Sequence, residues 1–107
     1  MSIQDEIKEI VTTHRVVLFM KGTPDFPQCG FSANAVQILR ACSVVDVATV
    51  NVLEHPDIRQ GIKEYANWPT IPQLYVNGEF VGGSDILTEM YQSGELKVML
   101  APSGQNA

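Results

Sequence analysis

The sequence predicts an α/β fold, a four-stranded mixed sheet with helices on both faces. Val16 to Met20 is a short continuous apolar run, which is typical of a strand buried on both faces. Asn77-Gly78 lies between two apolar segments and is a strong signal for a two-residue hairpin. Helical and strand patterns alternate before this hairpin, as in a βαβ unit, whose strands are parallel. The hairpin then adds an antiparallel pair, which makes the sheet mixed.

The expected elements follow the order α-β-α-β-α-β-β-α, with a last short helix. Ile3, Ile7 and Val11 recur at helical spacing behind Ser2, which is suited to cap the first helix. Pro56 suits the first turn of the third helix, and the glycine and prolines of residues 21–28 indicate a loop. The expected helices span residues 2–13, 30–42, 56–65, 84–91 and 95–100, and the expected strands span residues 16–20, 47–52, 73–76 and 79–81.

Length and composition limit the organisation and the partners. The chain has 107 residues, enough for one compact domain and too few for two. Residues 1–100 are expected to form that domain, and residues 101–107, which are small and polar, are expected to be disordered. Seven basic and twelve acidic residues give a net charge of −5. This charge argues against nonspecific nucleic-acid binding, because phosphate contacts need clustered Lys and Arg.

The sequence also bears on location. It contains no run of roughly 18 uncharged apolar residues, the length of a membrane span, so we expect no membrane insertion. Residues 1–10 carry three acidic side chains and no arginine, which argues against a secretory signal and a transit peptide. Two cysteines are too few for a disulfide framework and indicate a reducing compartment. We therefore expect a cytoplasmic protein, or one of an organelle matrix if a transit peptide has been removed.

Cys29-Gly30-Phe31-Ser32 looks like a C-x-x-C redox motif in which Ser32 replaces the second cysteine. Cys29 lies between a loop and the start of a helix, where peptide N–H groups and the helix dipole favour a thiolate. Lys21, at the end of the preceding strand, adds positive charge, and both effects lower the pKa of a thiol. The alternative is a buried structural cysteine. The loop position beside Pro27 and Gly30 favours the reactive thiol.

Cys42 is expected to play a different part. It lies near the end of the helix that Cys29 begins, about 20 Å away at ~1.5 Å per residue, which is too far for a disulfide. A small core residue, or a partly exposed one, is the favoured interpretation. A peripheral redox role through glutathionylation or an intermolecular disulfide stays open as the alternative.

Four motifs together resemble those of the monothiol glutaredoxins, CGFS type, over about residues 2–100. They are Lys21-Gly22-Thr23-Pro24, Cys29-Gly30-Phe31-Ser32, Trp68-Pro69-Thr70-Ile71-Pro72-Gln73 and Gly82-Gly83-Ser84-Asp85. The resemblance implies a thioredoxin-like (glutaredoxin) fold, glutathione binding and a [2Fe–2S] cluster shared between two subunits.

The resemblance also implies roles for residues beyond the thiol. Ile71-Pro72 resembles the cis-proline of the fold, which would turn the Ile71 backbone toward the cysteinyl backbone of glutathione; the alternative is a trans proline that begins an edge strand. Gly83 would let a ligand approach the backbone. Ser84 and Asp85 would offer N–H groups to the γ-glutamyl carboxylate, and the Asp85 side chain would accept its ammonium. A plain helix cap is the alternative for Asp85.

Further implied ligand contacts come from two cations and an aromatic ring. Lys21 and Arg59 would bind the glycyl carboxylate and face the thiolate; the alternative for Arg59 is a solvated helix face. Phe31 would line the site beside Cys29, while Trp68 is equally consistent with a core anchor. Some relatives carry cysteine where Ser84 stands, so this chain lacks a second thiol there.

The functional expectation follows from the ligands that a cluster needs. A [2Fe–2S] cluster takes four soft ligands, and the resemblance supplies them as Cys29 from each of two chains and two glutathione thiolates. It implies a homodimer that carries the cluster and delivers it to apo iron–sulfur client proteins, in iron and redox homeostasis, with a BolA-type protein as a further partner. The alternative is a glutathione-dependent oxidoreductase that reduces mixed disulfides through Cys29. A third alternative is an interaction module with a vestigial site.

Overall fold

The computed structural model describes residues 2–101 and confirms the predicted fold class. The elements are α1 (Ile3–Thr13), β1 (Val16–Met20), α2 (Gly30–Ala41), β2 (Val47–Asn51), α3 (Pro56–Ala66), β3 (Gln73–Val76), β4 (Glu79–Gly82), α4 (Ser84–Ser93) and α5 (Glu95–Leu100). Each expected helix and strand is present, with ends that coincide with the predicted ends or lie within two residues of them. The expected disorder of the C-terminal tail concerns residues that, apart from Ala101, lie outside the described range.

The four strands form one sheet in the order β2-β1-β3-β4. β1 and β2 are parallel, as the βαβ pattern predicts, and β3 pairs antiparallel with both β1 and β4. The hairpin between β3 and β4 turns at Asn77 and Gly78, whose φ angles are 53° and 82°. Two consecutive positive φ angles fit the Asn-Gly pair. The central position of β1 explains why all five of its residues are buried.

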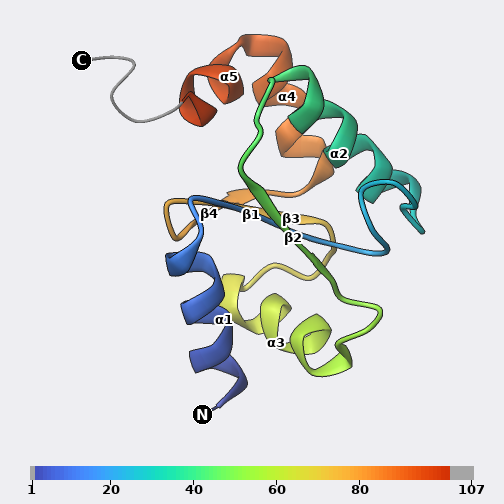
Figure 1. The fold of residues 1–107 in the computed structure, drawn as a ribbon, viewed down its shortest axis with the longest axis vertical. Helices are drawn as coiled ribbons and strands as arrows, with labels where there is room; N and C mark the ends of the chain where they lie inside the picture. The colour runs from blue at the N-terminus through green and yellow to red at the C-terminus, as the bar shows by residue number, and fades with distance from the viewer. Residues whose placement is uncertain (1, 102–107) are drawn as a thin grey trace.

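Helices cover both faces of the sheet (Figure 1). α1 and α3 lie on one face, and α2, α4 and α5 lie on the other. Alternate residues of β1 point to opposite faces, so Leu18 packs with the α2, α4 and α5 side, and Phe19 packs with the α1 and α3 side. None of the helices within residues 2–101 is long and apolar enough to cross a membrane.

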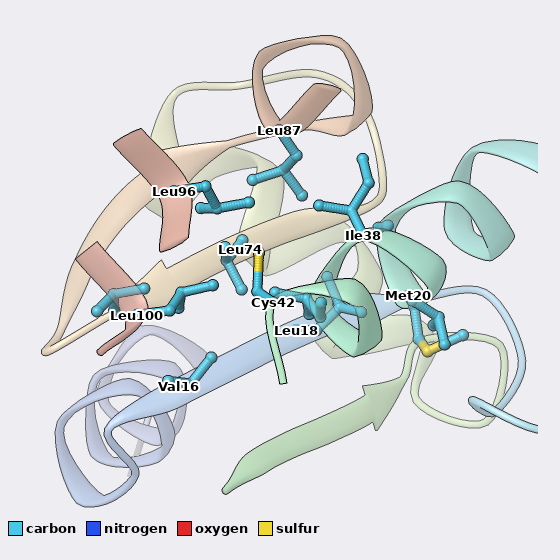
Figure 2. Close-up of a cluster of buried hydrophobic side chains, with 13 residues drawn as sticks. Val16, Leu18, Met20, Ile38, Cys42, Leu74, Leu87, Leu96 and Leu100 are labelled. Carbon is cyan, nitrogen blue, oxygen red and sulfur yellow. The ribbon is translucent and has the colours of Figure 1, made fainter. Parts of the chain in front are cut away.

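Cys42 belongs to the core on the α2 face. Figure 2 shows its side chain among Leu18, Leu74 and neighbouring apolar residues, and it is 8% exposed. Burial raises the pKa of the Cys42 thiol, although the charge of Lys97 acts in the opposite direction. The core interpretation of Cys42 is therefore confirmed, and a redox role would need the thiol to leave this cluster.

One arginine joins three segments at the end of the sheet away from Cys29, where β1 begins. The Arg15 guanidinium donates from Nε and Nη2 to both carboxylate oxygens of Asp46, each at 2.7 Å, and from Nη1 to the Leu100 carbonyl at 3.1 Å. These contacts join the start of β1, the segment before β2 and the end of α5. The hydrogen bonds from Arg15 hold the pKa of Asp46 below its ordinary value.

We predict that Asp46→Asn lowers the free energy of unfolding by about 1 kcal/mol at neutral pH, since exposed ion pairs contribute little more. The folded-state pKa of Asp46 lies below its unfolded value. The carboxylate therefore stabilises the fold fully above the unfolded pKa, and this contribution is lost as the pH falls through the folded-state value. Urea unfolding of both proteins between pH 7 and pH 3 measures the difference. If the difference in unfolding free energy between the two proteins does not shrink toward pH 3, the Asp46 carboxylate is not the stabilising group.

Candidate functional site

The site lies where the parallel strands end. Lys21 follows the last residue of β1, and the loop after it returns to Cys29, which is the N-cap residue of α2. Gly22 and Pro27 form a bridge across this loop, and the Thr23 and Phe26 backbones exchange hydrogen bonds of 3.3 and 3.0 Å. The loop is therefore ordered by its own backbone pairing. It delivers a half-buried thiol to the start of a helix.

Peptide groups of α2 stabilise the Cys29 thiolate. The described residues supply no standard capping hydrogen bond at this helix start; the N–H groups of Ser32 and Phe31 act on the sulfur instead. Burial alone raises the pKa of Cys29. These two N–H groups, the Ser32 hydroxyl and the charge of Lys21 outweigh it and lower the pKa below its ordinary value. The predicted activation of Cys29 thus has a structural basis in the helix start and in Lys21.

Ser32 has a larger role than the sequence indicated. Its side chain is fully buried, and its hydroxyl accepts a hydrogen bond from the Lys21 N–H at 3.1 Å. A hydroxyl has one hydrogen to donate besides its acceptor sites, and that hydrogen is free to stabilise the thiolate of Cys29. Ser32 therefore supports the backbone of Lys21 and also contributes to the lowered pKa of Cys29. Sequence reasoning treated Ser32 mainly as the absence of a second thiol.

A pocket lies next to Phe31, whose N–H acts on the Cys29 sulfur, although Cys29 itself is not among the lining residues. It is lined by Phe31, Trp68, Thr70, Ile71, Pro72, Gly83, Ser84, Asp85 and Ile86. Six of these residues were predicted for the site from the sequence, and the fold brings them together from α2, the segment before β3 and the start of α4. The Ile71-Pro72 peptide bond is cis, as expected. Phe31 is 64% exposed and forms the wall next to Cys29.

The start of α4 forms one wall of this pocket. Gly83 is the N-cap residue, so Asp85 is not the helix cap that was its alternative role. A Cβ atom on Gly83 would lie 3.2 Å from the Pro72 carbonyl oxygen and 3.3 Å from Trp68 Nε1, which explains the need for glycine. The first N–H groups of a helix have no partner within the helix. Those of Ser84 and Asp85 have none elsewhere in residues 2–101.

Two side chains that sequence reasoning did not single out position these walls. Gln73 is fully buried, and its Nε2 donates to the carbonyls of Trp68 and Thr70 at 3.1 and 3.2 Å. Asn34 Nδ2 donates to Ser84 Oγ at 2.9 Å and to Thr88 Oγ1 at 3.0 Å, which joins α2 to α4. Ser84 thus turns its side chain to Asn34. The sequence analysis included Gln73 only as the last residue of a motif and assigned it no role.

Trp68 forms part of the pocket wall and has an aromatic neighbour. Its ring packs against Phe80 with centroids 5.7 Å apart, and it also lines the pocket. The indole N–H is buried and has no hydrogen-bond partner within the described part of the chain. Trp68 is half-buried and belongs to neither core cluster, so it packs on Phe80 at the margin of the core and is not a core anchor.

The two cations stand apart from the pocket lining. Lys21 is close enough to Cys29 to lower its pKa. Arg59 lies near the start of α3, half-buried, and forms no ion pair with the residues described. Neither side chain belongs to the pocket wall. The predicted contact of Arg59 with a ligand stays a prediction.

A metal site within one chain is not apparent. In residues 2–101, no three His, Cys, Asp or Glu side chains gather where they would hold a metal ion. The donor set of one chain is the single thiolate of Cys29. A cluster with four soft ligands would therefore need donors from outside the chain.

The chain is similar to known glutaredoxins in both sequence and fold. The glutaredoxin family model matches residues 16–81. A protein of Synechocystis named as an uncharacterized monothiol glutaredoxin is 62% identical over 94 residues, which cover 88% of this chain and 87% of that protein. The mitochondrial glutaredoxin-related protein 5 of zebrafish is 58% identical over 87% of this chain and 60% of its own length. The solution structure of reduced poplar apo GrxS14 has a TM-score of 0.77 and 55% identity, over 90% of this chain and 87% of that one.

The fold and the single activated thiol at a helix start define a thioredoxin-like protein with a monothiol site. The family match and the identities extend this class to a family. The chain belongs to the glutaredoxins, and many of its relatives are named monothiol glutaredoxins.

We predict that Ser32→Ala raises the pKa of Cys29, because the thiolate loses one of its stabilising groups. The change also leaves the Lys21 N–H unpaired, which costs about 1–3 kcal/mol of unfolding free energy. The rate of alkylation by iodoacetamide as a function of pH reports the pKa, in a Cys42→Ser background so that one thiol reacts. An unchanged midpoint would show that the hydroxyl does not act on the sulfur.

Proposed function

We propose that this monothiol glutaredoxin binds glutathione and, as a homodimer, carries a [2Fe–2S] cluster that it delivers to apo iron–sulfur proteins. The observation that carries the proposal is the combination of one stabilised thiolate with an adjacent pocket whose α4 wall offers unpartnered N–H groups. The thiolate is a soft ligand for iron. The pocket is where a small anionic thiol would supply the second ligand.

The pocket suits glutathione from two ends. The N–H groups of Ser84 and Asp85 are free to donate to the γ-glutamyl carboxylate, because helix starts bind anions. The exposed Asp85 carboxylate lies beside them, where it would receive the γ-glutamyl ammonium. The buried residues Ile71 and Pro72 also line the pocket, and the cysteinyl part of the ligand would lie against them. Lys21 and Arg59 would bind the glycyl carboxylate.

The number of soft donors supports a dimer. Cys42 is buried in the core, so each chain contributes Cys29 alone. Two chains and two glutathione thiolates complete four ligands. Bound glutathione is a ligand that exchanges with solvent, which suits a protein that hands its cargo on. A BolA-type protein in place of one subunit is part of the same proposal, as is the cytoplasmic location.

The second candidate is an oxidoreductase, which the lowered pKa of Cys29 favours. The Cys29 thiolate would attack the glutathionyl sulfur of a mixed disulfide and release the substrate thiol. A second glutathione thiolate would then attack the Cys29 adduct, giving glutathione disulfide and restoring the Cys29 thiolate. A mixed-disulfide turnover assay distinguishes the two functions, since a carrier is expected to turn over slowly.

We predict that anaerobic reconstitution with ferrous iron, sulfide and glutathione gives a cluster-bearing dimer, seen by visible absorption and size-exclusion chromatography. Cys29→Ser should lose the cluster, because a hydroxyl is a poor iron ligand. Cys42→Ser is the matched control and should keep the cluster. A cluster retained by Cys29→Ser, or formed equally well without glutathione, would refute the proposal.

We predict that Gly83→Ala weakens glutathione binding about tenfold, or ~1.4 kcal/mol. The added methyl would press on the Pro72 carbonyl and on Trp68 Nε1 and narrow the pocket. Gly30→Ala is the control, since its methyl would meet nothing within 4 Å. Calorimetric titration with glutathione compares the variants. Equal affinity in Gly83→Ala and the unmodified protein would place the ligand elsewhere.

A further inference from the structure

Two side chains from different elements hold the chain where it leaves β1. The Lys21 N–H donates to Ser32 Oγ at 3.1 Å, and the next N–H, that of Gly22, donates to Asn51 Oδ1 at 2.9 Å. Asn51 is the last residue of β2. The same oxygen of Asn51 also accepts the Leu53 N–H at 3.0 Å. One amide oxygen therefore joins the segment after β1 to the turn after β2.

Each of the two segments that Asn51 joins is next to a cationic side chain of the proposed site, Lys21 in one case and Arg59 in the other. The Gly22 N–H belongs to the peptide bond that follows Lys21, and the charge of Lys21 acts on Cys29. The turn that begins at Leu53 continues into α3, where the Arg59 N–H donates to the His55 carbonyl at 2.9 Å. The position of Asn51 thus fixes the backbone beside Lys21 and the entry to the helix that carries Arg59.

The geometry of Gly22 leaves the segment little freedom to find another partner. Its φ angle is 93°, and a Cβ atom there would lie 2.5 Å from the Phe26 carbonyl oxygen. The Lys21 carbonyl is also engaged, since it accepts the Gln28 N–H at 2.9 Å. Without the Asn51 oxygen, the part-buried Gly22 N–H and the exposed Leu53 N–H would lose their acceptor at once. The segment after β1 would then move to satisfy the Gly22 N–H, because a part-buried donor is costly when unpaired.

We propose that Asn51 is a positioning residue that holds Lys21 and the α3 entry in a fixed relation, so that the two cations bind the glycyl carboxylate of glutathione. This inference rests on the proposed glutathione site. Asn51 itself needs no contact with the ligand. Its effect is therefore confined to the ligand's glycyl end and to the charge that Lys21 places near Cys29.

The test compares two ligands that differ at that end. Glutathione and γ-glutamylcysteine, which lacks the glycyl residue, are titrated by calorimetry into the full chain and into Asn51→Leu, Asn51→Ala, Lys21→Met and the Asn51→Ala/Lys21→Met double variant. Asn51→Leu should weaken glutathione about tenfold or more, since charge-assisted contacts are lost, while γ-glutamylcysteine changes less than about twofold. The double variant should lose less than the sum of the two single losses, because the contact of Lys21 with the ligand cannot be lost twice.

A matched control separates positioning from general stability. Asp46→Asn removes the hydrogen bonds at the opposite end of β2 and should leave both ligand affinities unchanged. The alkylation profile of Cys29 gives a readout without ligand, and its midpoint should move to higher pH in Asn51→Leu. If Asn51→Leu does not fold, Asn51→Ala carries the same comparisons.

The outcomes are distinguishable. A full chain that binds neither ligand overturns the glutathione site, and the alkylation profile then still tests whether Asn51 positions Lys21. Normal binding by the full chain, with equal losses of both ligands in the Asn51 variants, would mean that Asn51 only stabilises the fold. Unchanged affinities together with an unchanged alkylation midpoint would also overturn the inference.

Discussion

The site depends on how the chain leaves β1. This strand is central and fully buried, and its neighbours on both sides satisfy its peptide groups. After Met20 that pairing ends, while the chain is still partly buried, and the N–H groups of Lys21 and Gly22 must find acceptors. Side chains of α2 and β2 supply them. A folding requirement thus fixes the backbone next to the reactive thiol.

The serine of the motif shows how this requirement and the chemistry coincide. Ser32 satisfies a peptide N–H of the chain leaving β1, and its hydroxyl lies close enough to the sulfur to lower the pKa of Cys29. A thiol is a weaker acceptor than a hydroxyl. A cysteine at this buried position would therefore support the segment less well. Serine at position 32 therefore supports the fold and also leaves the site with a single thiol.

Local patterns were enough for the fold. The apolar run of β1, the Asn77-Gly78 turn and the Ser2 cap each depend on neighbours in sequence, and each is present as predicted. α4 runs two residues past the expected end, to Ser93, because Gly94 adopts a φ of 87° and ends it there. For the site, the local pattern identified Cys29 at a helix start, while the role of Gly83 and the cis bond at Pro72 came from the resemblance of the motifs to a known family.

The polar supports escaped prediction because their partners are distant in sequence. Ser32 is 11 residues from Lys21, Asn51 is 29 residues from Gly22, and Asn34 is 50 residues from Ser84. Nothing in the neighbourhood of a lone Asn or Ser shows which N–H or hydroxyl it will meet. These pairs exist only once the sheet brings the ends of β1 and β2 to one edge and packs α2 against α4.

The site offers local groups that favour an anion, although the chain as a whole is negatively charged. The net charge is −5, so the protein as a whole does not attract an anion. Attraction of an anionic ligand must therefore come from fixed local groups.

The start of α2 is already used by the chain's own thiolate, which takes the N–H groups of Phe31 and Ser32. The start of α4 has no such internal anion, and its N–H groups line the pocket without a partner in the described chain. Asn34 ties the two helices together, so the filled and the open helix start keep a fixed separation. That arrangement is the physical basis of the proposed glutathione site, in which a carboxylate would lie at the start of α4 and a thiol near the start of α2.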